Sequence, residues 1–381
     1  MEVNRERLAA NFTELCEIDS PSREEGRMSL RLQAIFRELG PEEIVEDDSS
    51  GRTGSECGNL IIRFAGNLAL EPIFFSCHMD TVQPAKGVQV KRTGDLFTSA
   101  GDTILGSDDK SGLAACVEAM RLLQEEGLPH RPVEFVITTC EEIGLVGAKM
   151  LDPKLIRAKE GYALDSSGFA KVVTHAPAAN RLTITVRGVA AHAGLHPEWG
   201  VNALIVAAKA LAQVPTGRID EETTANFGTI NGGTASNIVP DMVVIEGEVR
   251  SHSVEKLDRL TETIREIFIA TVADWRDPAG EAKGAPSVSI EVRQDFPVMQ
   301  LDRDDRVIRR VDAAAQSIGM ELSYEKAGGG SDANILNGHG LATAIIATGM
   351  TNVHSTNEQV ELQDMVDLTR LLIALLTESS C

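Results

Sequence analysis

Short apolar runs alternate with a helical pattern through the first part of the chain, and this alternation restricts the possible folds more than any other feature. The strand-like runs are NLIIRF (59–64), PIFFSC (72–77), PVEFVITTC (132–140) and GYALD (161–165), and the helical pattern covers 111–127. Runs that are apolar throughout indicate strands covered on both faces, as in parallel sheets flanked by helices. We therefore expect an α/β domain with a central, mostly parallel sheet.

The pattern changes near residue 178. RLTITVRG (181–188), MVVIEGEVR (242–250) and SVSIEVRQ (287–294) are strand-like, with alternation typical of half-exposed strands, and helical patterns cover 201–214 and 253–274. These features indicate a small α+β domain whose sheet has one face open to solvent. After about 295 the α/β character returns, with a helix at 304–318, a buried run at 341–347 and a helix at 359–377. We therefore expect a discontinuous domain, 1–177 with 291–381, interrupted by an inserted lid domain, 178–290.

The beginning of one helix also has a sequence signature. Ser22 and Glu25 are three residues apart, ahead of a helical pattern that ends near Gly40. This spacing is typical of a capping box, in which the two side chains bind each other's backbone N–H groups. We expect the helix to begin at this pair.

The charge balance and the cysteines limit the partners and the compartment. The 381 residues include 36 basic and 57 acidic residues, a net charge of −21, which disfavours nucleic acid and anionic membranes as partners. The N-terminal segment lacks the apolar core of a signal peptide, and no apolar run approaches the ~20 residues that span a bilayer. The six scattered cysteines form no CxxC pair, which favours reduced, mostly buried thiols. We expect a cytoplasmic protein.

Histidine and carboxylate residues follow the expected strands of the first domain. His78 and Asp80 come after PIFFSC, Glu141 and Glu142 come after PVEFVITTC, and Asp165 ends GYALD. A further acidic pair, Asp108 and Asp109, stands just before the 111–127 helix. Because ligands of open α/β sheets gather at the carboxyl ends of the strands, we expect these side chains at one sheet edge.

Each of these residues also has an ordinary structural interpretation. Taken alone, His78 fits a hydrogen-bonded core histidine, Asp108 an N-cap, and Glu141–Glu142 a solvated helix start. Asp80 and Asp165 each fit a turn. Together, however, these interpretations would leave several acids close to one another with nothing to balance their charge, which is costly when they are buried. Oxygen and nitrogen donors without cysteine suit zinc, manganese or cobalt, so we favour a metal site.

Seven motifs in a fixed order resemble those of the M20 family of metallopeptidases, and within it the peptidase T-like aminotripeptidases. They are SCHMDTV (76–82), LGSDDKSG (105–112), TTCEEIGLVGAK (138–149), ALDSSG (163–168), GVAAHAGLHPEWGVNA (188–203), GGTASNIVPD (232–241) with EGEVRS (246–251), and NVHSTNE (352–358). Each motif alone is weak, but the whole series is specific. The resemblance implies a zinc-peptidase-type catalytic domain and a lid domain of the dimerisation type, which makes a homodimer through the lid possible.

The resemblance implies two divalent ions per chain, with zinc favoured and manganese or cobalt as alternatives. Asp108 would bridge the ions, His78 and Asp165 would complete one site, and Glu142 and His354 would complete the other. Without the resemblance, His354 is an ordinary loop histidine. Glu141 would be the general base, Asp80 would orient the His78 imidazole, and the Asp108–Asp109 peptide bond would be cis.

The resemblance also implies substrate-binding residues. His192 in the lid would stabilise the oxyanion, and Asn237 and Arg250 would hold the substrate's backbone or carboxylate. Arg250 suits a carboxylate because its planar fork donates two parallel hydrogen bonds. Without the resemblance, an ordinary surface ion pair is the preferred interpretation of this residue. Asp332, in the run AGGGSDAN (327–334), would lie near the substrate or cap a helix; this run lacks the GK[ST] ending of a P-loop.

The resemblance implies a dinuclear aminopeptidase that cleaves short, tripeptide-like peptides. N-acyl amino acid deacylases and carboxypeptidases of the same family share the metal cluster and remain alternatives, because the fold does not decide the substrate. A protein that binds metal or peptide without catalysis is a third interpretation, which the presence of Glu141 and all five ligands disfavours.

Overall fold

The computed structural model describes residues 2–377, which form two compact units. One unit combines the chain up to Ala176 with the chain from Met299 onward, and the other is Pro177–Val298. The assignment of the first as catalytic domain and of the second as lid stays a prediction.

The first unit is built on a large mixed sheet with the strand order β1-β2-β6-β3-β7-β16-β8-β14, and β15 pairs with β8. The neighbours β6, β3, β7 and β16 run parallel, and β15 runs parallel to β8. The pairings β1-β2, β2-β6, β16-β8 and β8-β14 are antiparallel. The strands are β1 (Glu43–Glu46), β2 (Leu60–Phe64), β3 (Ile73–His78), β6 (Val133–Thr138), β7 (Glu160–Ala163), β8 (Lys171–Ala176), β14 (Met299–Gln300), β15 (Ser323–Lys326) and β16 (Ala342–Ile346). The expected α/β domain with a mostly parallel sheet is therefore confirmed.

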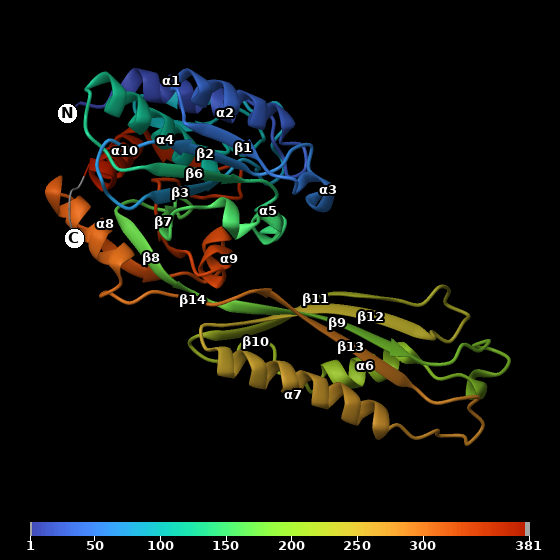
Figure 1. Cartoon of the computed structure of the whole chain (residues 1–381). Coiled ribbons are helices and arrows are strands. Elements are labelled where there is room, and N and C mark those ends of the chain that lie inside the picture. Colours follow the sequence, from blue (N-terminus) through green and yellow to red (C-terminus); the bar gives the residue numbers. More distant parts are fainter. Residues whose placement is uncertain (1, 378–381) are drawn as a thin grey trace. The chain divides into compact units, whose positions relative to one another are not determined.

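Helices cover both faces of this sheet (Figure 1). They are α1 (Arg5–Cys16), α2 (Gly26–Glu38), α3 (Ser50–Thr53), α4 (Ser107–Glu125), α5 (Val146–Met150), α8 (Arg306–Ser317), α9 (Asp332–Gly338) and α10 (Leu362–Thr377), with a 3-10 turn at Pro153–Leu155. Phe75 packs into the larger core with α1, α2, α4, α8 and α10, whereas Phe74 packs on the opposite face with Leu336 of α9. The apolar runs predicted buried strands because both of their faces are covered. A small antiparallel sheet adds β4 (Val90–Thr93), β5 (Leu96–Ser99) and β17 (Gln359–Glu361).

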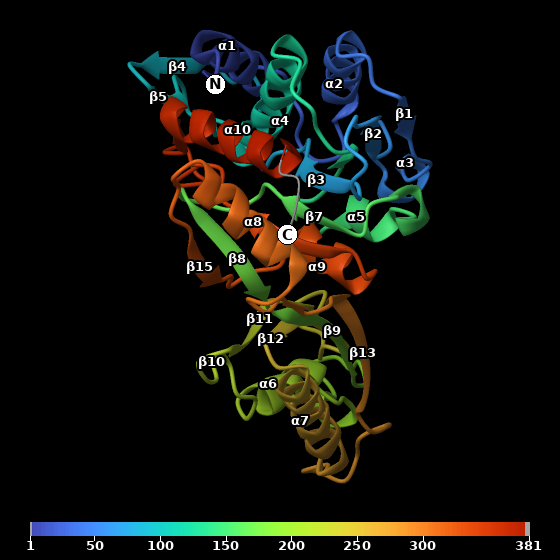
Figure 2. The same ribbon diagram turned by 60° about the vertical axis from the view of Figure 1, so that its left-hand side comes forward.

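The second unit is an antiparallel sheet with the order β10-β11-β12-β9-β13 and two helices on one face (Figure 2). Its elements are β9 (Ala178–Arg187), a 3-10 turn at Pro197–Trp199, α6 (Ala203–Leu211), β10 (Gly217–Arg218), β11 (Thr223–Gly232), β12 (Met242–Ser251), α7 (Val254–Ala273) and β13 (Ser287–Phe296). Leu182, Ile184 and Val186 of β9 pack under α6 and α7, while the alternating residues Arg181, Thr183 and Thr185 point to the other face. The expected α+β unit with one open sheet face is therefore present.

The cysteines and the helices bear on two expectations, reduced thiols and the lack of a membrane-spanning segment. The described cysteines are all buried and free, as expected for reduced thiols; they are Cys16, Cys57, Cys77, Cys116 and Cys140, and Cys381 lies outside the described residues. Among the helices described, none combines the length and apolar content that crossing a membrane requires. The cytoplasmic location stays a prediction.

Candidate metal centre

The parallel strands of the large sheet bring the predicted residues to one edge. β6, β3 and β7 are adjacent and parallel, and His78 at the end of β3 pairs in register with Thr138 at the end of β6. Glu141 and Glu142 follow β6, and Asp165 follows β7. The carboxyl ends of these strands therefore supply one histidine and three carboxylates, as the sequence predicted.

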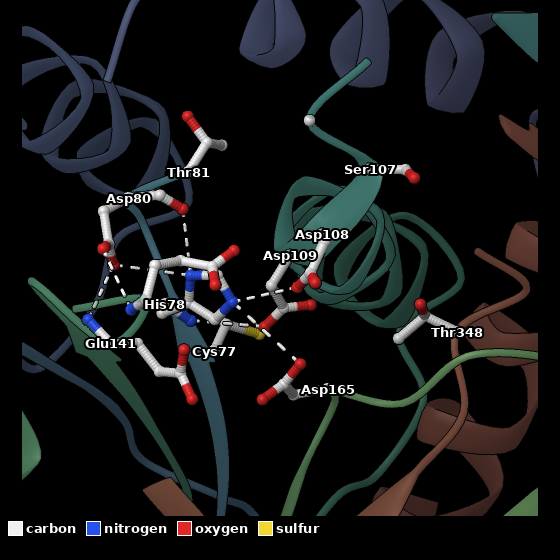
Figure 3. A network of polar contacts seen from close by, with 12 residues as sticks. Cys77, His78, Asp80, Thr81, Ser107, Asp108, Asp109, Glu141, Asp165 and Thr348 are labelled. Atoms are coloured by element: carbon white, nitrogen blue, oxygen red, sulfur yellow. Dashed lines mark hydrogen bonds and ion pairs between the residues drawn. The ribbon is translucent and has the colours of Figure 1, made fainter. Parts of the chain in front are cut away.

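Asp108 lies between two histidines that come from distant parts of the chain. Its Oδ1 is 3.0 Å from Nε2 of His78, and its Oδ2 is 3.3 Å from Nε2 of His354. His354 Nε2 also lies 3.0 Å from a carboxylate oxygen of Glu142. Figure 3 shows Asp108 and His78 pointing toward each other, with Asp165 close by. This is the arrangement that a bridging carboxylate requires, and the Asp108–Asp109 peptide bond is cis, as the resemblance implies.

The donor atoms are arranged as a divalent cation requires. His78, Asp108 and Glu142 form one group and His78, Glu141 and Asp165 another, and within each group the potential ligand atoms lie within 4.8 Å of one another. Bonds of ~2.0–2.2 Å around a tetrahedral ion place its ligands about 3.4 Å apart. The observed nitrogen-to-oxygen distances from His78 to Asp108 and Asp165, 3.0 and 4.0 Å, are close to this value. Oxygen and nitrogen donors at these distances suit zinc, manganese or cobalt.

The cluster concentrates negative charge in a buried place. Burial and the nearby charge of Asp165 raise the pKa of Glu141 well above its usual value, and burial together with Asp108 raises the pKa of Asp165 to about 8. Hydrogen bonds to Asp108 and Glu142 raise the pKa of His354 to about 10. Despite its burial, the pKa of Asp108 is lowered by hydrogen bonds with His354 and His78. The histidines therefore balance Asp108 but not the remaining acids, which is the environment that a bound cation relieves.

Asp80 supports the cluster through both its carboxylate and its main chain. The carboxylate accepts hydrogen bonds from the backbone N–H groups of Glu141, at 2.9 Å, and Glu142, at 3.2 Å. His78 Nδ1 is 2.9 Å from the main-chain carbonyl oxygen of Asp80 and 3.5 Å from its Oδ1. Because a carbonyl oxygen only accepts, Nδ1 carries the proton, and a neutral His78 presents the lone pair of Nε2 to the site.

Ser22 and Glu25 support the same turn, and the expected capping box is wrong. Helix α2 begins at Gly26, and Glu25 is its N-cap without a side-chain capping bond. The Ser22 hydroxyl instead donates to Asp80 Oδ2, and buried Glu25 accepts the backbone N–H of Cys140 at 3.0 Å. Cys140, immediately before Glu141, has a positive φ of 54°. The spacing of Ser22 and Glu25 gave a wrong prediction because both side chains bind residues that are distant in the sequence.

Asp332 is the first residue of α9, and its side chain lies next to the end of β6. Its Oδ2 accepts the hydroxyl of Thr138, and it is 4% exposed. The helix cap is Ser331, which forms a capping box with Asn334. Burial raises the pKa of Asp332 to about 6, and its charge in turn raises the pKa of Glu141. Asp332 is thus close enough to Glu141 to influence it, and its contact with substrate stays a prediction.

The second unit contains the other predicted substrate residues. The loops of His192 and Asn237 are paired, since Ala193 N–H donates to the carbonyl of Asn237 at 2.9 Å. His192 Nδ1 accepts the backbone N–H groups of Gly194 and Leu195, both at 3.2 Å. A neutral His192 therefore carries its proton on Nε2, which is suited to donate a hydrogen bond.

Arg250 lies on β12 and pairs with a carboxylate of the same strand. Its Nε and one terminal nitrogen are each 3.0 Å from an oxygen of Glu248. Its guanidinium carbon lies 6.0 Å from the ring centroid of Phe296. The surface ion pair and the substrate role, both considered for this residue, are compatible, because its side chain keeps 32% exposure.

Comparisons with known proteins agree on one family. The model of peptidase family M20/M25/M40 matches residues 74–378. The Bacillus subtilis (strain 168) protein YqjE is 39% identical over 379 residues, covering 99% of this chain and 100% of that protein. The crystal structure of aminopeptidase PepT from Bacillus cereus ATCC 10987 matches with a TM-score of 0.88 and 40% identity, covering 98% of both chains. A tripeptidase from Staphylococcus aureus subsp. aureus Mu50 matches with a TM-score of 0.89 and 33% identity, covering 99% of both chains. The resemblance drawn from the seven motifs is confirmed: the chain belongs to peptidase family M20/M25/M40.

Proposed function

We propose that the protein is a dinuclear zinc aminopeptidase that releases the N-terminal residue of short peptides, with tripeptides as its main substrates. The observation that carries the proposal is the position of Asp108, whose two carboxylate oxygens face His78 and His354. The names of the two similar solved proteins, an aminopeptidase and a tripeptidase, support the substrate class. Manganese and cobalt are the alternative metals.

In this proposal the five predicted ligands divide around Asp108. His78 and Asp165 would complete one site, and Glu142 and His354 would complete the other. When bound, two such ions lower the pKa of a water molecule and stabilise the negative charge that develops on a substrate carbonyl oxygen. Asp80 contacts the ring of His78 and accepts the backbone N–H groups of Glu141 and Glu142, which positions these three residues.

Glu141 is the proposed general base. It would take a proton from the attacking water and deliver it to the leaving amine, which requires a carboxylate whose pKa is raised toward neutrality. Burial and neighbouring charge act on Glu141 in this direction. His192, with its proton on Nε2, would donate to the oxyanion, and Asp332, Asn237 and Arg250 would hold the substrate. A homodimer through the second unit is part of the proposal, and light scattering of the purified protein would show it.

A substrate panel tests the proposed activity against the family alternatives. We expect zinc-loaded protein to cleave unblocked tripeptides and to release the first residue. N-acetylation of the same peptides should lower kcat/KM at least ~100-fold, because a buried site that binds an amine loses its partner. Cleavage of N-acetyl amino acids without cleavage of free tripeptides would instead identify a deacylase, and release of the last residue a carboxypeptidase.

Arg250→Ala should lower kcat/KM for tripeptides about 10–100-fold, since a hydrogen bond to a charged group contributes ~1.5–3 kcal/mol. Steady-state kinetics measure the effect of the substitution on kcat/KM, and thermal unfolding measures its effect on stability. Glu248→Ala is the matched control, because it breaks the same ion pair and leaves the arginine in place. If both variants lose the same stability and neither changes kcat/KM, Arg250 is a structural residue of β12.

A further inference from the structure

Glu358 is a buried carboxylate outside the set of predicted ligands. It is 1% exposed and lies four residues after His354, just before β17. Its Oε2 accepts the backbone N–H groups of Leu105, at 2.8 Å, and Gly106, at 2.9 Å. Its Oε1 accepts the hydroxyl of Ser107, at 2.7 Å, and the backbone N–H of Asp108, at 3.0 Å. All four donors belong to the four consecutive residues that end at the proposed bridging ligand.

The segment that Glu358 binds leads into α4 and lacks regular helical geometry. Gly106 has a left-handed φ of 80°, and Asp108 and Asp109 have non-helical dihedral angles although they stand at the start of α4. Their N–H groups therefore lack the carbonyl partners that a helix interior supplies. A concave row of backbone N–H groups of this kind binds an anion. Here the anion is a side chain of the same protein, contributed from about 250 residues further along the chain.

The backbone of Glu358 belongs to the closed loop that contains His354. Thr351 and Gln359 exchange two backbone hydrogen bonds, at 2.8 and 3.0 Å, which close the loop. Inside it, the backbone N–H of Glu358 donates to the carbonyl of Ser355 at 3.1 Å. His354 has a positive φ of 60° and a half-exposed side chain. The loop therefore ties the backbone of His354 to the side chain that holds Asp108.

We propose that Glu358 is a positioning residue that sets the distance between Asp108 and His354 and thereby controls metal affinity. It touches neither substrate nor the proposed ligand atoms; it joins the two loops that carry them. The inference rests on the proposed metal site and adds to it a residue outside the predicted ligands. Without Glu358, the backbone donors of residues 105–108 lose a shared acceptor, and the two sides of the bridge are free to move apart.

A purely structural role would predict only a loss of stability, so a matched buried carboxylate is needed as control. Glu134 is 2% exposed and accepts hydrogen bonds from Arg63 Nε at 2.8 Å and from the backbone N–H groups of Arg157, at 2.8 Å, and Ala158, at 2.7 Å. It belongs to the same unit and is on β6, but it binds none of the proposed ligands in these contacts. Its replacement therefore reproduces the burial and the lost hydrogen bonds without disturbing the Asp108 loop.

The experiment compares zinc affinity and stability in Glu358→Gln, Ser107→Ala and Glu134→Gln, each in the full-length protein. Glutamine is not a neutral replacement for Glu358, because its NH₂ group would face backbone N–H donors. Competition with a chromophoric zinc chelator should show affinity lowered at least ~10-fold in Glu358→Gln and about 3–10-fold in Ser107→Ala, which loses one hydrogen bond. Glu134→Gln should lower Tm about as much as Glu358→Gln does, but it should keep zinc affinity within ~2-fold of wild type.

Unchanged zinc affinity in folded Glu358→Gln, or an equal loss in Glu134→Gln, overturns the proposal. If Glu358→Gln does not fold, Ser107→Ala decides, since it removes one donor and leaves the carboxylate. Zinc affinity and peptide hydrolysis are measured in separate assays. A wild-type protein that binds two zinc ions but cleaves no peptide would contradict the proposed function alone, whereas a wild-type protein that binds no zinc contradicts both.

Discussion

Replacing Glu141 by glutamine is expected to lower kcat for tripeptide hydrolysis by about 10²–10⁴-fold, the usual contribution of a general acid–base group. This corresponds to ~3–5 kcal/mol in the activation free energy. The amide keeps the size of the side chain, and the backbone of Glu141 stays bound to Asp80. We therefore expect zinc content to change little while turnover is lost. Kinetics and metal analysis of the same preparation measure the two properties.

Glu118→Gln provides the control for this substitution. Glu118 is also buried, at 1% exposure, and it forms an ion pair with Arg7 at 2.8 Å. Its replacement should lower the stability of the protein but leave kcat within ~2-fold of wild type. Near-wild-type turnover in Glu141→Gln would show that another group activates the water. A parallel loss of zinc would instead indicate that Glu141 is a ligand, in line with its grouping with His78 and Asp165.

Removing the metal with a chelator is expected to abolish hydrolysis and to lower Tm, and adding zinc back should restore both. The physical reason is the uncompensated charge of the buried carboxylates, which a cation stabilises in the folded state only. Metal analysis after zinc-replete purification should give two ions per chain. Less than one ion per chain, with no chelator-sensitive hydrolysis, would favour a protein that binds without catalysis.

The metal-free protein should also lose stability as the pH rises from 5 to 8. The pKa of Asp165 is about 8 in the folded protein, whereas an unfolded aspartate titrates near ~3.9. Between these values the folded state binds more protons than the unfolded state, so the free energy of unfolding falls as the pH rises. Asp332, with a pKa of about 6, acts in the same direction in the lower part of this range, and His354, with a pKa of about 10, acts above ~6.5.

Thermal unfolding with and without zinc measures this difference. A loss of only ~1 kcal/mol lowers Tm by ~2–4 °C in a domain of this size, so we expect at least that decrease between pH 5 and 8 without metal. The zinc-loaded protein should show a smaller decrease, and metal-free Asp165→Asn should also show one. A metal-free Tm that rises over this pH range would mean that these acids are already balanced by the protein itself.

The strands that could be predicted are those whose side chains bury apolar surface. In β3 every residue is buried, so the run PIFFSC has no other plausible location. Strand β11 was missed because most of its residues are exposed, and TTANFGTING has neither an apolar run nor a clear alternation. Its hydrogen bonds to β12 define it, and backbone pairing leaves no signal in a single sequence. Strands that are defined by backbone pairing and not by burial could therefore not be predicted from the sequence.

The candidate site divides along similar lines. His78, Glu141, Glu142 and Asp165 could be placed together because strand ends of a parallel sheet converge. His354 came from resemblance alone, since its loop has no periodic pattern. Ser22, Glu25 and Glu358 were missed as supporting residues, although Glu358 stands within the motif NVHSTNE. Each of them acts through hydrogen bonds to distant backbone groups, and only the folded chain shows such partners.

The distribution of cysteines makes the two units distinguishable in an unfolding experiment. The five buried thiols all belong to the first unit, and residues 177–298 contain no cysteine. A buried thiol reacts with an alkylating reagent only when its surroundings open. In a Cys381→Ser protein, pulsed thiol labelling would therefore report opening of the first unit alone, while circular dichroism reports both units. A difference between the two midpoints would show whether the insertion unfolds on its own, without any engineered label.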